Sequence, residues 1–212
     1  MIGRLIARDV RRSLSGGAWL PVAFFLLVAT IVPFAVGPDA RLLARIGGGA
    51  LWIAALTAAL LPIERLVEPD RADGTLDQLT IMGVSEEAVA AAKIIGHWLT
   101  FGPLLLIAAV PGSFLVGLDG PALTRCLIAL AIGTPALAAL AVGVAALTAG
   151  LARAGALAGL LLMPLAVPLV IFGAAATGDG ESAALKLEAA VALLTVAGAP
   201  FVGGAAIRAS RS

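Results

Sequence analysis

The sequence of 212 residues has a single cysteine, Cys126, and a single histidine, His97. One cysteine excludes an internal disulfide and a cysteine-based zinc site, because each needs at least two thiols. The net charge of +1 lacks the basic excess of nucleic-acid-binding proteins, so no nucleic acid partner is expected. The phosphate-binding pattern G-x-x-x-x-G-K-[ST] is also missing from the sequence. Any ATP used by this protein must therefore be bound by another chain.

Charged residues are scarce as well. Only 13% of the residues are charged, 61% are hydrophobic, and the mean hydropathy is +1.08. Soluble domains have about 25% charged residues. The composition therefore predicts an integral membrane protein. Few acids, bases or metal ligands fall within the apolar stretches, so no catalytic site, no metal site and no enzymatic activity are expected.

Six windows are almost free of charge and long enough to cross a bilayer, which takes roughly 20 apolar residues in a helix. The predicted fold is all-α, with six transmembrane helices. Arg153 marks the break between the fourth and fifth windows, and the loops on the outer side, 38–45, 118–124 and 178–188, are too short to form domains. The predicted spans are residues 18–36, 47–63, 94–118, 126–152, 154–178 and 189–207.

Lys and Arg concentrate on one side of these spans, and loops rich in Lys and Arg stay in the cytoplasm. This rule places both termini and residues 64–93 in the cytoplasm. The cytoplasmic set is Arg4, Arg8, Arg11, Arg12, Arg65, Arg71, Lys93, Arg153, Arg208 and Arg211, against Arg41, Arg45, Arg125 and Lys186 outside.

The first 16 residues combine four arginines with apolar residues at helical spacing, among them Leu5, Ile6 and Val10. This pattern is typical of a helix lying in the membrane interface, in contact with lipid. The alternative is a short basic tail that only fixes the topology. The apolar run that follows is too long for a signal peptide, so the segment is expected to be retained.

Residues 64–93 form the only sizeable polar segment. A turn at 69–74 precedes a short helix, for which Thr75 is the expected cap, and Ser85 is expected to cap a second helix. Leu76, Leu79 and Met82 share one face of the short helix. Two interpretations of this apolar stripe remain open: it docks into a groove of a partner, or it packs against its own neighbours.

The run D-G-T-L-D-Q-L within this segment resembles the coupling segment of ABC-2-type transporter permeases. Over nearly its whole length the chain resembles the CcmB family, the permease subunits of the ABC transporter of bacterial cytochrome c maturation. Glycines 48 and 83 and Ser85 stand where the family usually has prolines. The blocks that carry the resemblance are Phe34–Pro38, Leu42–Ile46, Leu51–Leu56, Asp73–Leu79, Ala92–Trp98, Gly133–Leu137, Met163–Phe172 and Ala199–Phe201.

The resemblance implies a non-catalytic subunit in the bacterial inner membrane, with residues 64–93 as a cytoplasmic coupling segment between spans two and three. It implies an ABC ATPase subunit that binds ATP, a tryptophan-rich haem-handling membrane subunit, a haem chaperone and a second copy of this chain as partners. The expected docking residues for the ATPase subunit are Asp73, Leu76, Asp77, Gln78, Leu79, Ile81, Met82 and Val84.

The expected function is to couple ATP hydrolysis by the partner to haem export or to release of a haem-loaded chaperone. Haem is then cargo, and no cofactor is bound by this chain. His97 with Trp98 is a weak candidate for a haem contact, since one imidazole can be an axial ligand. The alternative function is export of another apolar substrate by an ABC-2-type permease.

Overall fold

The computed structural model describes residues 1–17, 19–178 and 182–210, and all regular structure in these ranges is helical. Ala18, Arg211 and part of the predicted loop at 178–188 lie outside the described residues. The nine α-helices of the described part are α1 (Ile2–Ser15), α2 (Trp19–Val36), α3 (Ala40–Leu60), α4 (Glu68–Ala72), α5 (Thr75–Ile81), α6 (Glu86–Leu115), α7 (Gly120–Thr148), α8 (Ala154–Ala176) and α9 (Ser182–Ala209).

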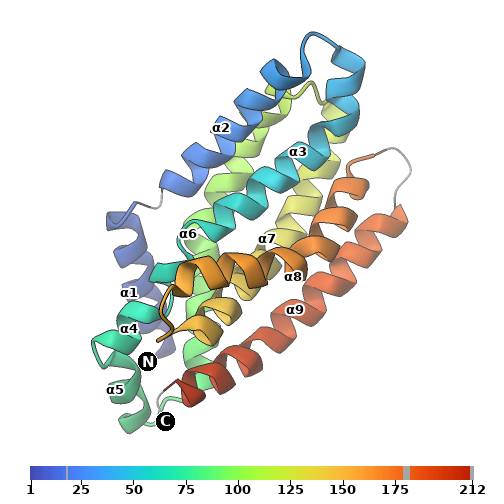
Figure 1. Ribbon diagram of the computed structural model, residues 1–212. Coiled ribbons are helices and arrows are strands. Elements are labelled where there is room, and N and C mark those ends of the chain that lie inside the picture. The colour runs from blue at the N-terminus through green and yellow to red at the C-terminus, as the bar shows by residue number, and fades with distance from the viewer. Residues whose placement is uncertain (18, 179–181, 211–212) are drawn as a thin grey trace.

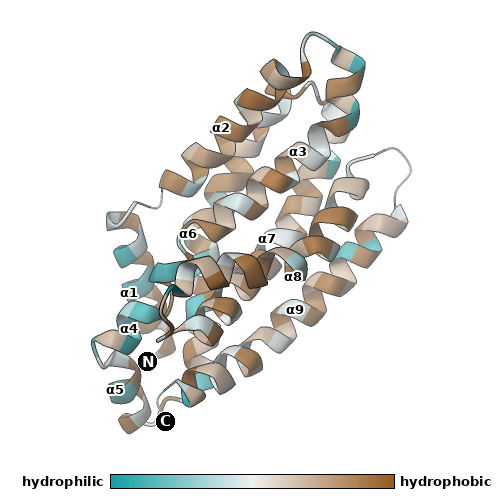
Figure 2. Ribbon diagram, in the orientation of Figure 1, coloured by the Kyte–Doolittle hydropathy of each residue, from teal (hydrophilic) through white to brown (hydrophobic). Residues whose placement is uncertain are grey.

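Six of these helices, α2, α3 and α6 to α9, are long and apolar enough to cross a membrane. They run side by side as an elongated bundle, and their hydrophobic residues extend along its length (Figures 1 and 2). The prediction of an all-α membrane protein with six spanning helices is confirmed. Helix α7 is the most buried of the six and packs against α3, α6, α8 and α9. It therefore forms the centre of the bundle.

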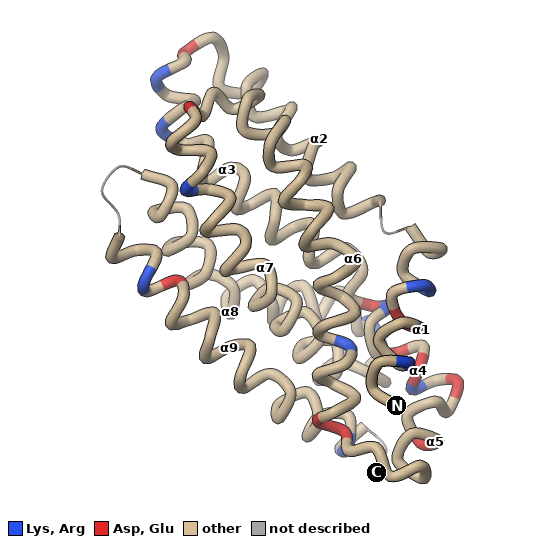
Figure 3. The backbone as a smooth tube through the Cα atoms, turned by 180° about the vertical axis from the view of Figure 1, so that it is seen from behind, with Lys and Arg blue, Asp and Glu red and all other residues tan. Residues whose placement is uncertain are grey.

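Both termini and the helices α1, α4 and α5 lie at one end of the bundle, which we call the terminal end (Figure 1). Hydrophilic residues gather on these three helices, and charges of both signs lie close together there (Figures 2 and 3). The turns between α2 and α3 and between α6 and α7 lie at the opposite end. The polar segment is thus folded against one end of an apolar bundle.

Side-chain caps set where several helices begin. The Asp39 carboxylate accepts hydrogen bonds from the backbone N–H groups of Arg41 and Leu42, so α3 begins at Ala40, seven residues before the predicted span. Helix α9 begins at Ser182 and contains Glu188, which the sequence placed in an outer loop. Because α9 packs on α7 along its length, Glu188 is fully buried.

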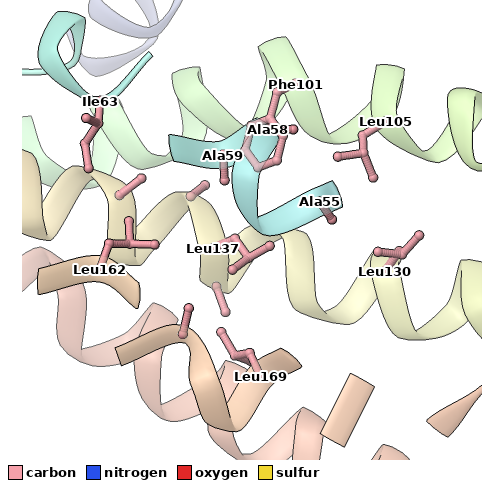
Figure 4. Packing of buried hydrophobic residues seen from close by; sticks show 14 of the residues in the cluster. Ala55, Ala58, Ala59, Ile63, Phe101, Leu105, Leu130, Leu137, Leu162 and Leu169 are labelled. Atoms are coloured by element: carbon pink, nitrogen blue, oxygen red, sulfur yellow. The ribbon is translucent and has the colours of Figure 1, made fainter. Parts of the chain in front are cut away.

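The core joins leucines of α7 and α8 to small residues of α3 and larger apolar residues of α6 (Figure 4). Trp52 of α3 is fully buried, and its ring lies against Gly133 of α7 and Gly173 of α8. A Cβ atom at either glycine would lie 2.2 Å from a carbon of this ring. Glycine is thus required at both positions to admit the indole. Figure 4 labels other residues of this core: Ala55, Ala58, Ala59, Ile63, Phe101, Leu105, Leu130, Leu137, Leu162 and Leu169.

Candidate functional site

The candidate site is the α4–α5 segment at the terminal end. Gly74, between the two helices, adopts a φ of 76°, and α5 begins at Thr75. The Asp73 carboxylate accepts a hydrogen bond of 3.0 Å from the backbone N–H of Thr75. The N-cap of α5 is Gly74, which has no side chain to cap the helix, so the prediction of Thr75 as the cap is wrong. Hydrogen bonds from the Thr75 side chain and backbone lower the pKa of Asp73.

The two faces of α5 have different surroundings. Leu76 is only 2% exposed, and Leu79 packs against the same core with Val84, which follows the helix. Ile81 is 86% exposed and Met82 is 62% exposed. The structure thus packs three of the five predicted apolar docking residues, Leu76, Leu79 and Val84, against the chain's own bundle and leaves the other two exposed.

Four exposed residues form two adjacent pairs that are four positions apart. We call them the outer face of α5: Asp77, Gln78, Ile81 and Met82. This spacing puts them on one side of a helix. Asp73, at the start of the segment, is exposed as well. The outer face combines two exposed apolar side chains with two exposed polar ones.

Asp70 of α4 anchors the segment to two other helices. It is 2% exposed, and its Oδ2 lies 2.5 Å from Nζ of Lys93 in α6 and 2.5 Å from Nη2 of Arg8 in α1. Its Oδ1 accepts a bond of 2.9 Å from Arg12 of α1. Lys93 also donates to the backbone carbonyl of Leu66 at 2.8 Å. One buried carboxylate therefore joins α1, α4 and α6.

A further bond ties the segment to the turn between α7 and α8. Glu68 accepts a bond of 2.7 Å from the N–H of Gly150, in the turn between α7 and α8, and also binds Arg71. At the start of α6, Ser85 caps the helix by accepting from the N–H of Ala88, as predicted. Arg208, near the end of α9, binds Glu86 and Glu87 beside this cap. The segment is thus in bonded contact with α1, α6 and the α7–α8 turn.

Helix α1 lies along α6 rather than apart from the bundle (Figure 3). Leu5 is buried, and Ile6 packs against the core. Gly96 of α6 lets α1 approach, since a Cβ atom there would lie 3.3 Å from Cβ of Asp9. Part of the apolar face that the sequence assigned to the membrane interface is therefore covered by the protein itself.

His97 and Trp98 are adjacent in α6 but point to different places. His97 is 5% exposed, its ring centre lies 4.7 Å from that of Phe101, and it lines a cavity beneath α1. Trp98 Nε1 donates to the Thr134 hydroxyl of α7 at 3.2 Å. The structure does not bring the two candidate haem contacts into one site.

Two buried acids were not identified from the sequence. Asp70 sits in a predicted turn, and nothing in its neighbourhood marked it as a buried ion-pair partner. Glu188 is fully buried, and neither carboxylate oxygen has a hydrogen-bond partner among the described residues. Within the described ranges, no three His, Cys, Asp or Glu residues cluster as metal ligands.

Comparison with known proteins adds independent information. The CcmB protein family matches residues 1–210. Heme exporter protein B of Rhodobacter capsulatus is 43% identical over 211 residues, which cover 96% of this chain and 97% of the relative. The protein of the same name from Paracoccus denitrificans is 44% identical, with the same coverage. That of Escherichia coli K12 is 40% identical over 196 residues, or 90% of this chain and 89% of the relative.

Proposed function

This chain belongs to the CcmB family, and we propose that it is the permease subunit of an ABC transporter complex required for cytochrome c biogenesis. The observation that carries the proposal is the outer face of α5, which protrudes from a segment bonded to α1, α6 and the α7–α8 turn. A surface exposed on one side and anchored on the other suits the transfer of motion from a partner. The names of the relatives support haem as the cargo of the complex.

The distribution of Lys and Arg supports an orientation with the terminal end in the cytoplasm of a bacterial inner membrane. Ten of these residues belong to the terminal side and four to the other side by the predicted spans. The relatives are bacterial. In this orientation α5 faces the compartment that supplies ATP.

An ABC ATPase subunit, which binds the ATP, docks on the outer face of α5. Ile81 and Met82 enter an apolar groove of the partner, and Asp73, Asp77 and Gln78 contact its polar rim. On its other side, α5 is held against the bundle by Leu76, Leu79 and Val84. These residues support the outer face from the bundle side. This chain needs no catalytic residue, since its task is to convert a displacement of α5 into rearrangement of the spans.

The displacement reaches the spans by two bonded routes. Through Asp70 it acts on Lys93 of α6 and on α1. Through Glu68 it acts on Gly150 between α7 and α8. Buried charge pairs and packed helices have discrete arrangements rather than a continuous range, so a small movement of α5 can select between two states of the bundle.

Two outcomes of this rearrangement fit a haem-handling complex: export of haem, or release of a haem-loaded chaperone from a neighbouring tryptophan-rich subunit. A second copy of this chain would serve a second ATPase subunit. The bundle has no shared His97–Trp98 site, which favours the release of the chaperone over haem ligation by this chain. The alternative of a permease for another apolar substrate is less well supported, because the family match extends over residues 1–210.

The test is the amount of covalent haem in c-type cytochromes of a strain that lacks this protein. Expression of the native chain should restore covalent haem, and an empty vector should not. Normal cytochrome maturation in the deletion strain would contradict the proposal and make another substrate the leading candidate.

A further inference from the structure

Glu188 is a buried acid that the function proposed above does not use. It belongs to the spanning helix α9, and its side chain is fully buried. Neither of its carboxylate oxygens has a hydrogen-bond partner in the described part of the chain. Ionisable side chains are costly inside a membrane and usually serve a function there.

The surroundings of this carboxyl group are apolar. A Cβ atom at Gly133 of α7 would lie 2.8 Å from Oε1 of Glu188 and 2.2 Å from the ring of Trp52, so the acid and the indole meet at the same bare stretch of α7. Trp52 Nε1 also lacks a hydrogen-bond partner among the described residues, so the indole does not donate to the acid. The packing therefore brings an aromatic ring and a glycine to this carboxyl group but no donor.

No described cation neutralises Glu188 either. On α9 itself, Lys186 is exposed. On α7, Arg125 donates to the backbone carbonyl of Thr177, and Cys126, which is within electrostatic range of Glu188, has no positive charge to offer. Helix α8 contains no ionisable residue. The ionisable residues of α3 and α6 make no bond to Glu188: Arg41, Arg45, Glu86, Glu87, Lys93 and His97.

These surroundings determine the form in which the acid can be buried. An ionised carboxylate without a partner would be very costly in an apolar core, and such a group takes up a proton instead. We propose that Glu188 is a proton-binding site of the bundle: the packed helices hold it as a neutral carboxylic acid, and the packing of α9 on α7 depends on that proton.

Loss of the proton would place a negative charge between α9, α7 and the ring of Trp52. The structure offers this charge no counter-ion, so it would be tolerated only if water entered or α9 moved away from α7. The proton is therefore linked to the arrangement of the helices. This inference does not rest on the coupling function, because it concerns the chain without its partners.

The protonation state is tested by infrared spectroscopy of the full chain at neutral pH in an ester-free detergent. The native chain should show the carbonyl stretching band of a protonated carboxylic acid, and the band should move to lower frequency in D2O. Glu188→Gln should abolish the band. Glu64→Gln is the matched control, because it removes an exposed glutamate at the terminal end, and it should retain the band.

The link to packing is tested by unfolding in mixed micelles with increasing dodecyl sulfate, at several pH values. An unfolded glutamate releases its proton above about pH 4.3. Above this pH the folded chain should bind one proton more than the unfolded chain, so its stability should fall as the pH rises, until the folded chain also releases the proton. The folding equilibrium constant should fall by up to about tenfold per pH unit relative to that of Glu188→Gln.

Three results would overturn the proposal. The first is the absence of a carboxylic acid band that depends on Glu188. The second is an equal pH dependence of stability in the native chain and in Glu188→Gln. The third is failure of Glu188→Gln to insert and fold, because the amide closely mimics a neutral acid and should be accepted in its place.

Discussion

Asp70 and Lys93 form a buried ion pair, with 2.5 Å between Oδ2 and Nζ and side-chain exposures of 2% and 4%. The two residues come from α4 and α6, which are separated by α5. The pair therefore closes the loop that carries α5 and holds that loop against a spanning helix. It is one of the points at which the polar segment is fixed to the bundle.

Removal of the carboxylate charge should destabilise the fold. In Asp70→Asn, the buried Lys93 loses its short ion pair and keeps only the longer one of 3.6 Å to Asp9, and Arg8 and Arg12 lose a shared carboxylate, so the free energy of unfolding should fall by about 3 kcal/mol. The measurement is the fraction of detergent-solubilised protein that stays monodisperse after heating. Asp73→Asn is the control, because Asp73 is exposed and should change stability little. Equal stability of Asp70→Asn and native protein would show that the pair does not anchor the segment.

A methyl group added at Gly173 should disturb the packing of Trp52. The added Cβ would lie 2.2 Å from the indole of this fully buried residue, and overpacking of this kind costs about 1–3 kcal/mol. Gly159→Ala, in the same helix, has no atom within 4 Å of the added Cβ and should be neutral or slightly stabilising. Thermal stability of the two variants, compared side by side, checks the prediction. Similar stability in both would mean that Trp52 can move aside.

The turn between α7 and α8 depends on glycine at position 150. Its φ is 81°, and Arg71 atoms lie 3.2 to 3.4 Å from the position of a Cβ. Gly150→Ala should lower the free energy of unfolding by about 1–2 kcal/mol, because an L-residue is strained in the left-handed region. Gly143→Ala, inside α7 with open space around the added Cβ, is the control. Denaturation of both variants by heat gives the comparison, and an unaffected Gly150→Ala would rule out the strained turn.

The two faces of α5 should respond differently to truncation. Leu76→Ala removes buried apolar volume and should cost about 2–3 kcal/mol of stability. Ile81→Ala removes a side chain that is 86% exposed, so its effect on the isolated chain should stay within about 0.5 kcal/mol. The measurement is thermal stability in detergent without any partner. A large loss of stability in Ile81→Ala would show that this side chain packs within the chain.

The sequence was sufficient to predict the class of the fold, since long charge-free windows and helix-capping residues can be recognised locally in the sequence. The Ser85 cap of α6 followed from such a local signal, and the six spanning helices followed from hydropathy. The division of α5 into a packed and an exposed face could not be predicted, because Leu76 and Met82 are both apolar and only tertiary contacts distinguish them. The burial of Asp70 depends on Arg8 and Arg12, more than fifty residues away in the chain.

The most direct test of the coupling account uses the double variant Ile81→Asp, Met82→Asp in the complete complex. The control is Arg4→Asp, which also introduces aspartate at an exposed position of the terminal end, away from α5. The quantity to measure is the amount of ATPase subunit that co-purifies with the chain from membranes. The account predicts normal membrane insertion of both variants, loss of the ATPase subunit from the α5 variant by at least about tenfold, and retention in the control. Retention of the ATPase subunit by a stably inserted Ile81→Asp, Met82→Asp variant would contradict the assignment of the outer face of α5 as the docking surface.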